Sequence, residues 1–590
     1  MLRSSPPGHL ASLHRQSQFC HQSRAKGLTS KRKTCTTSSL LLTSLLHSAM
    51  VIEAPELRQH IARFLDFSTL KAFSLVRKAW YFDAHPVLWD RFSCKVPRSL
   101  SSKEYTVWLD TIRKKANLFR HIHYDQFKPI EPQIRDLLLD QCHGLVTIET
   151  IVIDSQDLAG YWEGTFRPLV QQNRVSLRQL QLRTPSITIA SLQLPNLLAS
   201  LLVSLPQLRS LELGIPLMAV EDLLPVLNAC SGSLGHLYLM SGLWRREKID
   251  KRRSAGRPNS SITKATPLQI KHLRVKGACF DNTLEDILSR LALHSLEELQ
   301  LETVSSLQMI RSLRDVLWRL TSLSLHEMHP SLEKVLPDIL HAIHPHQLCH
   351  VYLGSLDTEC TTVLIEQQHQ SLESLSVTFM KDHTGALADI MATCRKLKSL
   401  TFVAKPFVDI RTLIDPQRPW TCTELEVFDG YFGLSHFPLL SHPAPPAPPP
   451  GSDLNEDPKR PTLVEHLFMQ RLGQLTNLHS VVQKNGQEQQ SFYDPFTDTW
   501  MAMQTMGWSM ASGLAHLAGL ANLRTLGFCD RNLPKGIGIH ELVFMKQHWH
   551  GLKELACLRI KSDLVEWLAT EWPELKVNMK PQRAAFFKPV

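Results

Sequence analysis

Residues 372–377 read Leu-Glu-Ser-Leu-Ser-Val, and residues 397–402 read Leu-Lys-Ser-Leu-Thr-Phe. Both segments follow the pattern L-x-x-L-x-L, whose last two apolar positions alternate with polar residues as in a half-buried β-strand. The pattern recurs along the chain at intervals of about 25 to 30 residues. Such recurrence predicts a stack of similar units rather than one globular core.

The spacing is that of leucine-rich repeats. Further clear copies are Leu177/Leu180/Leu182, Leu208/Leu211/Leu213, Leu234/Leu237/Leu239, Ile270/Leu273/Val275, Leu296/Leu299/Leu301, Leu320/Leu323/Leu325, Leu348/Val351/Leu353, Cys422/Leu425/Val427, Leu523/Leu526/Phe528 and Leu552/Leu555/Cys557. Weaker relatives are Phe119/Ile122/Tyr124, Ile148/Ile151/Ile153 and Trp572/Leu575/Val577. A single amphipathic helix explains one such match but not the whole series.

The segments between the copies predict helices. Ile287–Leu293 and Val363–Gln368 hold helix-compatible residues without Gly or Pro. Strand and helix therefore alternate, and we expect an α/β leucine-rich-repeat solenoid with parallel strands on the concave face and helices on the convex face. One repeat cannot bury its own core, so neighbouring repeats must stack.

The array is interrupted between Val427 and Leu523. Residues 435–461 include the run Pro-Ala-Pro-Pro-Ala-Pro-Pro-Pro, which lacks amide donors and favours extended polyproline geometry. We expect a surface loop or linker there, with recruitment of an SH3 or WW module as the alternative. A degenerate repeat near Leu475/Leu478 follows, and residues 462–590 are expected to hold the C-terminal repeats.

The net charge of +10 is concentrated in two segments. Residues 1–49 hold seven Lys or Arg and no Asp or Glu, and residues 244–267 hold eight basic and two acidic residues. The rest of the chain carries a slight excess of acid. The first segment is a Ser-rich tail, and the second is a loop within the expected solenoid, which covers residues 96–434. Basic charge confined to a tail and one loop indicates solvated segments rather than a groove that binds nucleic acid. An alternative interpretation of the run Lys251-Arg252-Arg253 is a nuclear import signal.

The N-terminal tail has two further interpretations. Its acid-poor composition is also that of a transit peptide. Met50 directly precedes the first well-patterned segment, so translation beginning at Met50 rather than Met1 would remove the tail.

Cysteine spacing and hydropathy restrict the class of protein. The twelve cysteines include no Cys-x-x-Cys motif, so neither a disulfide framework nor a zinc ribbon is indicated. The leucine-rich stretch at Leu40–Leu46 is too short to span a membrane. We therefore expect a soluble protein of the cytoplasm, the nucleus or both, without a membrane partner.

The segment before the repeats, residues 50–95, predicts three short helices. It contains Pro55-Glu56-Leu57, Leu75-Val76 and Trp80, with a later Leu88-Trp89. Its apolar residues recur at steps of three and four, and Pro55 suits a first helical turn.

These motifs resemble the F-box, whose form is Leu-Pro-x-Glu-Leu, Ile, Leu, Leu, Leu-Val-x-x-Trp and a late Leu-Trp. Ala54 stands where the family usually has Leu. The resemblance implies docking to a Skp-type adaptor and, through it, to a cullin. By the resemblance, one set of residues would form or support the adaptor-binding face: Pro55, Glu56, Leu57, Ile61, Leu65, Leu70, Leu75, Val76 and Trp80. The alternative is a helical cap that only shields the first repeat.

Catalytic and metal-binding signatures are absent. The sequence has no Walker A motif, no His-Glu-x-x-His, no Gly-x-Ser-x-Gly and no RING-type ligand set. The possible zinc ligands are the sets His121/His123 and His341, His344, His346, Cys349 and His350, which we interpret as incidental. We expect a non-catalytic protein without a cofactor.

The outward positions of the strands predict where a target protein binds. Three consecutive copies carry large or charged residues at these positions, and Tyr and Arg are favoured interface anchors. The predicted target-binding residues are His236, Tyr238, His272, Arg274, Lys276, Glu298, Gln300 and Tyr352. An alternative is that Lys276 and Glu302 simply pair across neighbouring strands.

Two functions follow from these features. The first is a substrate receptor of a Skp–cullin–F-box (SCF) ubiquitin ligase, which captures a target protein through the repeats. The second is a non-degradative scaffold or interaction module whose N-terminal helices only cap the solenoid.

Overall fold

The computed structural model describes most of the chain between residues 55 and 578. Within these limits it describes all residues except 66, 76–77, 95–100, 126–130, 152–157, 184–193, 215–219, 231, 241–267, 277–294, 305–316, 329–335, 380–383, 405–407, 434–462, 484–490, 495–498, 503–505, 529–536 and 558–561. The basic tail, Val76, the basic loop and the proline-rich segment predicted above therefore lie outside the described residues.

The chain divides into two compact units. The first comprises Met1–Ser93 and Arg98–Ile122, and the second comprises Cys94–Pro97 and His123–Val590. Seventeen of the described strands belong to one sheet. The prediction of an α/β fold with a long parallel sheet is confirmed.

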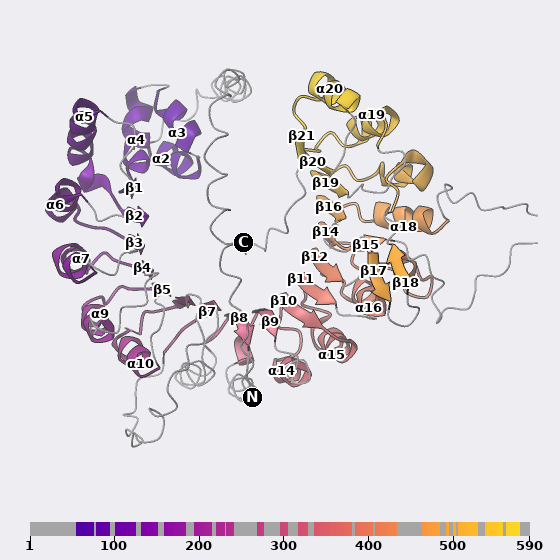
Figure 1. Ribbon diagram of the computed structural model, residues 1–590, viewed down its shortest axis with the longest axis horizontal. Coiled ribbons are helices and arrows are strands. Elements are labelled where there is room, and N and C mark those ends of the chain that lie inside the picture. The colour runs from indigo at the N-terminus through magenta and orange to yellow at the C-terminus, as the bar shows by residue number, and fades with distance from the viewer. Residues whose placement is uncertain are drawn as a thin grey trace, which may run out of the picture. The chain divides into compact units, whose positions relative to one another are not determined.

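The first unit is mainly helical, and Figure 1 shows α2, α3 and α4 packed together. Its elements are α2 (Pro55–Phe64), α3 (Phe67–Ser74), α4 (Lys78–Leu88), β1 (Arg91–Ser93), α5 (Ser102–Arg113) and η2 (Ala116–Leu118), and β2 (His121–Asp125) begins in it. Three helices occur where the sequence predicts them. The helix α5 begins at a capping box, because the Ser101 side chain accepts from the Glu104 amide and Glu104 accepts from the Ser101 amide.

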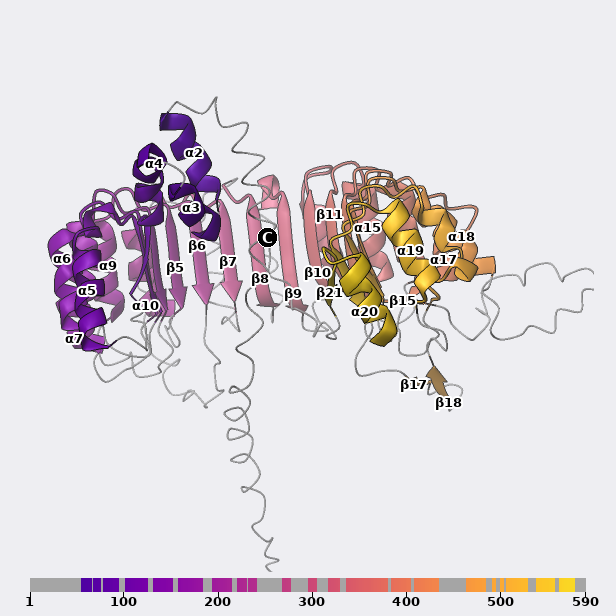
Figure 2. The same ribbon diagram turned by 90° about the horizontal axis from the view of Figure 1, so that it is seen from above.

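The second unit is a series of parallel strands with helices between them. The strands of its sheet are β3 (Thr147–Ile151), β4 (Gln179–Arg183), β5 (Ser210–Gly214), β6 (His236–Met240), β7 (His272–Lys276), β8 (Glu298–Val304), β9 (Ser322–Met328), β10 (His350–Leu356), β11 (Ser374–Phe379), β12 (Ser399–Ala404), β14 (Val427–Gly430), β16 (Ser480–Gln483), β19 (Thr525–Phe528), β20 (Glu554–Cys557) and β21 (Lys576–Asn578). Each strand from β3 onward pairs in parallel with the next one in this series. Figure 2 shows β5 to β11 side by side and pointing the same way.

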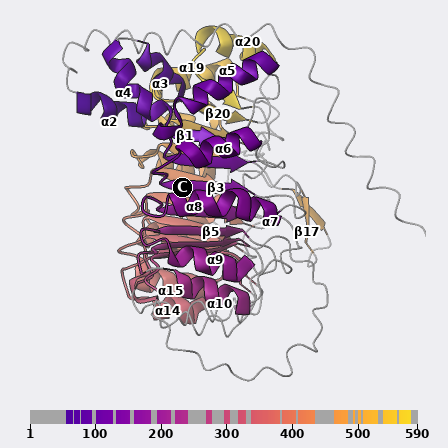
Figure 3. The ribbon, with the colours of Figure 1, turned by 90° about the vertical axis from the view of Figure 1, so that its left-hand side faces the viewer.

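Helices return the chain from one strand to the next. They are α6 (Pro132–Gln141), α7 (Leu158–Tyr161), η3 (Trp162–Phe166), α8 (Arg167–Gln172), α9 (Leu194–Val203), α10 (Val220–Ala229), η5 (Leu317–Arg319), α14 (Leu336–Ala342), α15 (Thr358–Gln368), α16 (Thr384–Thr393), α17 (Ile410–Leu413), α18 (Leu463–Gly473), η6 (Met510–Ser512), η7 (Leu514–Leu517), α19 (Ile539–His548) and α20 (Ser562–Glu571). Figure 3 shows α6, α9 and α10 stacked in chain order. The helix predicted at Val363–Gln368 belongs to α15, whereas Ile287–Leu293 lies outside the described residues.

The core lies between strands and helices. The leucines of successive copies are directly paired in register, for example Leu180 with Leu211 and Leu211 with Leu237, and all three are buried. Side chains on alternate strand positions face the other way, so the same backbone that buries leucines presents polar residues on the open face of the sheet.

Three predicted copies are out of register. One is displaced by two residues, because Val577, taken as a third position, pairs with Leu555, the second position of the copy before it. The other two are wrong by three residues. Ile148, taken as a first position, pairs with Leu180, the second position of the next copy. Likewise Leu425 was taken as a second position, but Phe428 pairs with Leu400. The true copies begin at Leu145 and at Leu425, which are both fully buried. Their third positions are Thr150 and Gly430, which are not the large apolar residues that the L-x-x-L-x-L pattern requires.

A glycine is required at one of these third positions. A Cβ atom on Gly430 would lie 2.6 Å from ring atoms of Phe402, so the ring of one repeat fills the space that a side chain of the next would need. The same crowding explains why the copy lacks its third apolar residue.

The interruption after Val427 contains more structure than the sequence analysis expects. The degenerate repeat is confirmed, because β16 follows it and Leu478 and Val481 are buried. In addition, β17 (Ser491–Asp494) and β18 (Thr499–Ala502) form an antiparallel hairpin that Figure 2 shows apart from the main sheet. A second small pair joins β13 (Val408–Asp409) to β15 (Phe432–Gly433) in parallel.

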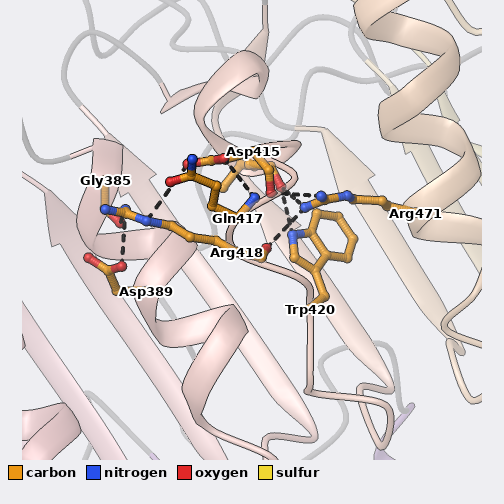
Figure 4. A network of polar contacts seen from close by, with 8 residues as sticks. Gly385, Asp389, Asp415, Gln417, Arg418, Trp420 and Arg471 are labelled. Carbon is orange, nitrogen blue, oxygen red and sulfur yellow. Dashed lines mark hydrogen bonds and ion pairs between the residues drawn. The ribbon is translucent and has the colours of Figure 1, made fainter. Parts of the chain in front are cut away.

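A polar network joins the repeats on either side of residues 434–462 (Figure 4). The Arg471 guanidinium in α18 donates to the carbonyl oxygens of Leu413 (2.9 Å), Asp415 (2.7 Å) and Arg418 (3.1 Å). Arg418 in turn pairs with Asp389 at 3.0 Å, and the Trp420 indole donates to the Leu413 carbonyl. The insertion therefore leaves the stacking of neighbouring repeats intact.

Candidate protein-binding surfaces

The three-helix bundle has its own small core. Ala62, Leu70, Phe73 and Ala84 are buried, and the rings of Phe73 and Trp80 lie 4.5 Å apart. Ile61, Leu65 and Trp80 pack against this core. These predicted adaptor-binding residues, together with Leu70, thus belong to the interior of the bundle and support its outer surface.

A buried ion pair fixes α2 against α4. The Arg58 Nε atom donates to an Asp83 carboxylate oxygen, and both side chains are about nine-tenths buried. Separating the two helices, or removing one of the two side chains, would leave the other charge buried without a partner, which is strongly unfavourable. The ion pair therefore holds α2 and α4 in one arrangement.

The same bundle exposes large apolar side chains. Phe64 is 77% exposed, Leu75 is 78% exposed and Phe82 is 61% exposed, and Tyr81 is exposed beside Phe82. Exposed apolar groups gathered on one small bundle are typical of a surface that a partner covers. Leu75 is a predicted adaptor contact, whereas Phe64, Tyr81 and Phe82 were missed because helical spacing alone does not tell an inward aromatic residue from an outward one.

The remaining residues of this prediction are placed only by their backbone. Pro55, Glu56 and Leu57 form the first turn of α2. Pro55 therefore occupies the first helical position, where its missing amide costs nothing.

The register of the sheet brings the predicted target-binding residues together. Tyr238 pairs with Arg274 and Arg274 with Gln300, while His236 pairs with His272 and His272 with Glu298. We call the following set the central row, because its members occupy equivalent positions on consecutive strands: Glu212, Tyr238, Arg274, Gln300, Ser324, Tyr352, Ser376 and Thr401.

Histidines and a carboxylate form an adjacent row. The rings of His236 and His272 stack with centroids 4.2 Å apart, and His272 Nδ1 lies 2.8 Å from Glu298 Oε2. Burial lowers the pKa of His236, and the neighbouring His272 lowers it further. His236 is therefore neutral at pH 7 and acts as a stacking surface.

Two ion pairs frame the central row. Arg183 Nε donates to Glu212 Oε1 at 2.6 Å. Lys276 lies 3.8 Å from Glu302 on the neighbouring strand, so the cross-strand pairing considered as an alternative for these two residues does occur. Both pairs are partly exposed and contribute little to stability.

Arg274 and His326 occupy the middle of the surface. The Arg274 guanidinium lies over the Tyr238 ring, 4.7 Å from its centroid. The His326 ring lies 4.2 Å from that of Tyr352, and His326 Nε2 lies 3.0 Å from both Gln300 Nε2 and Ser324 Oγ. His326 was missed, although the rule that flanking residues of a copy point outward would have found it.

The candidate metal ligands have other contacts. His123 Nδ1 lies 2.9 Å from Glu149 Oε2, and His121 lies 3.3 Å from Asp90. His341 lies in α14, His344 and His346 follow it, and Cys349 and His350 lie at the start of β10. In the part of the chain that the structure describes, no three metal-ligating side chains lie together.

Among the described helices, none is both long and apolar enough to span a lipid bilayer. Seven cysteines in the described part of the chain are free thiols: Cys94, Cys142, Cys230, Cys349, Cys360, Cys394 and Cys422.

Comparison with known proteins adds no assignment. No protein-family model matches the chain, and no curated protein matches it.

Proposed function

We propose that the chain is the substrate-recognition subunit of an SCF ubiquitin ligase. In this proposal α2, α3 and α4 are an F-box that docks on a Skp-type adaptor and, through it, on a cullin. The leucine-rich repeats hold a target protein on the open face of the sheet. Such a subunit works in the cytoplasm or the nucleus.

One observation carries the proposal: the helical bundle exposes Leu75, Phe64 and Phe82 although it has a core of its own. Helices that only covered the end of a sheet would have no need of exposed aromatic residues on a separately packed bundle. A docking surface needs them, because burying apolar area is the main source of free energy in protein association.

The proposed contribution to the reaction is proximity. Ubiquitin is supplied by other subunits, and binding a target beside them raises its effective concentration. The chain itself then needs no catalytic residue and no cofactor.

Co-purification with a Skp adaptor tests this function. The full chain and the adaptor are produced together, and the wild type is compared with Leu75→Asp and Phe64→Asp. Each substitution places a charge where a partner would bury an apolar side chain worth about 1.5–3 kcal/mol, so we expect adaptor affinity to fall by about tenfold or more.

The matched control is Gln59→Asp, which adds the same charge at an exposed position of α2. It should bind the adaptor like the wild type, and all variants should keep the wild-type melting temperature. Failure of the unaltered protein to bind any Skp adaptor would exclude the F-box and leave the scaffold function.

A further inference from the structure

The Arg274 guanidinium on the open face of the sheet has no carboxylate partner among the residues that the structure describes. Its Nε atom is buried without a hydrogen-bond partner, and among the described residues no carboxylate forms an ion pair with it. The guanidinium lies over the face of the Tyr238 ring. A guanidinium offers several N–H donors and no acceptor, so its natural partner is an anion.

The acidic groups around Arg274 are already engaged. Glu212 accepts from Arg183, Glu298 lies 2.8 Å from His272, and Glu302 lies near Lys276. Each carboxylate thus has a basic neighbour other than Arg274. Of Arg183, Arg274 and Lys276, Arg274 is therefore the one without a carboxylate partner, and its guanidinium lies on an aromatic ring.

Two uncharged side chains near Arg274, those of His326 and Gln300, can donate and accept hydrogen bonds. Burial lowers the pKa of His326, and Arg274 and Lys276 also lower it, against the opposing effect of Glu302. His326 is therefore neutral at pH 7. Gln300 is almost fully buried between Arg274 and Ser324, which fixes the position of its amide.

The next strands present small hydroxyl side chains along the same row. Beyond Tyr352, the register places Ser376 and then Thr401 in line. Small side chains leave room for the main chain of a bound peptide, and their hydroxyls can bond to its polar groups.

We propose that the central row binds an extended acidic segment of the target protein, with one Asp or Glu carboxylate on Arg274 and the segment continuing over Ser324, Tyr352, Ser376 and Thr401. The inference rests on the proposed function, because it takes the repeats to be the target receptor. A guanidinium pairs well with a carboxylate in a two-point contact. One uncompensated charge matches a carboxylate, whereas a doubly charged phosphate group would call for at least a second cation.

Selection from a displayed library of short random peptides tests the inference. The full-length wild type, Arg274→Gln and Arg274→Glu are each used as bait. We expect the wild type to enrich peptides that share an Asp or Glu at one position, and Arg274→Glu to enrich Lys or Arg there. Arg524→Gln is the matched control, because Arg524 is an exposed arginine at the start of another strand, and it should enrich the wild-type set.

The selected peptide then allows a double-mutant cycle by fluorescence polarisation. Arg274→Gln, or replacement of the peptide acid by its amide, should each weaken binding by about tenfold or more, and the two changes together should cost little more than one. Arg274→Lys should restore part of the affinity. A phosphoserine peptide of the same sequence should bind no better than the acidic one.

The inference is overturned if no peptide is enriched, if the enriched peptides share no acidic position, or if Arg274→Gln enriches the wild-type set. Tighter binding of the phosphoserine peptide would also overturn it. Adaptor binding is a separate readout: Arg274→Gln should bind the Skp adaptor normally, so failure of the peptide site and failure of the F-box are distinguishable.

Discussion

Buried thiols show how single residues couple the repeat core to pH. Cys142, Cys394 and Cys422 are completely buried in the second unit. Burial raises the pKa of Cys142, Cys394 and Cys422 to about 12 in each case, and for Cys394 the nearby Cys422 adds to the effect. A thiolate is therefore much less stable in the folded protein than in the unfolded chain.

This coupling predicts alkaline destabilisation. Because the folded state keeps the thiol protons, the stabilisation is complete below the unfolded pKa, near 9, and is lost as pH rises towards 12. Each thiol should lower the free energy of unfolding by about 1.4 kcal/mol per pH unit in this range. Urea unfolding between pH 8 and 10.5 measures the slope.

The control is the variant in which the three cysteines are replaced by alanine. It will be less stable at pH 8, but its stability should decline less steeply with pH. Equal slopes for the two proteins would show that these thiols do not govern the decline.

Residues of the candidate sites differ in how well the sequence predicts them. Tyr238, Arg274 and Gln300 were found because strand alternation fixes which side chains share a face. The Lys276–Glu302 pair was predicted as an alternative and does occur. The pairing of Glu212 with Arg183 and the exposure of Phe64 and Phe82 were not predicted, since both depend on which neighbouring element a side chain meets.

At the scale of elements, side chains at the ends of helices tie one repeat to the turn of another. The Gln368 side chain, at the end of α15, accepts from the amides of Gln347 and Leu348 (both 2.9 Å) and donates to the His344 carbonyl. Asn173, after α8, does the same for Gly144 and Leu145. Both side-chain amides are essentially fully buried, and so are Leu145 and Leu348, two of the residues whose backbone amides they satisfy.

A second set of ties comes from serines that precede the first apolar position of a copy. Each donates its hydroxyl to the carbonyl of the first apolar position in the copy before it: Ser176 to Leu145, Ser233 to Leu208, Ser295 to Ile270 and Ser371 to Leu348. The sequence contains the dipeptide Ser-Leu at each of these places, but the hydrogen bonds between copies are seen only in the structure. The first of these bonds also identifies Leu145 as the start of its copy, which Ile151 and Ile153 had obscured.

Replacing the helix-end amide tests its role. In Gln368→Leu the amides of Gln347 and Leu348 lose their acceptor, and each unsatisfied buried group costs about 1–3 kcal/mol. We expect a loss of stability of about 2–5 kcal/mol by thermal or chemical unfolding.

Gln370→Leu is the matched control, because Gln370 is exposed in the turn that follows α15. It should change stability by less than about 0.5 kcal/mol. Equal effects of the two substitutions would contradict the proposed role of Gln368.

At the scale of the whole molecule, the repeat array is extended by adding units, and among the described strands each one from β4 to β8 pairs with its two neighbours in the series. The general architecture was predictable for that reason, because one short pattern repeated many times specifies it. The position of an insertion was predictable where its composition is unusual, as in the run of prolines within residues 435–461. The hairpin of β17 and β18 has no such sequence signature and was not predicted.

The nearest-neighbour pairing of the strands also determines how the molecule will respond to mechanical force. Since each described strand from β3 onward pairs with its neighbours in the series, pulling the chain from its two ends loads the last strand of the sheet first and then the next one. Each released repeat of about 25 to 30 residues should lengthen the chain by roughly 80–100 Å. An optical trap should therefore record a series of similar small steps, whereas a single large rupture would show that distant repeats bear load together.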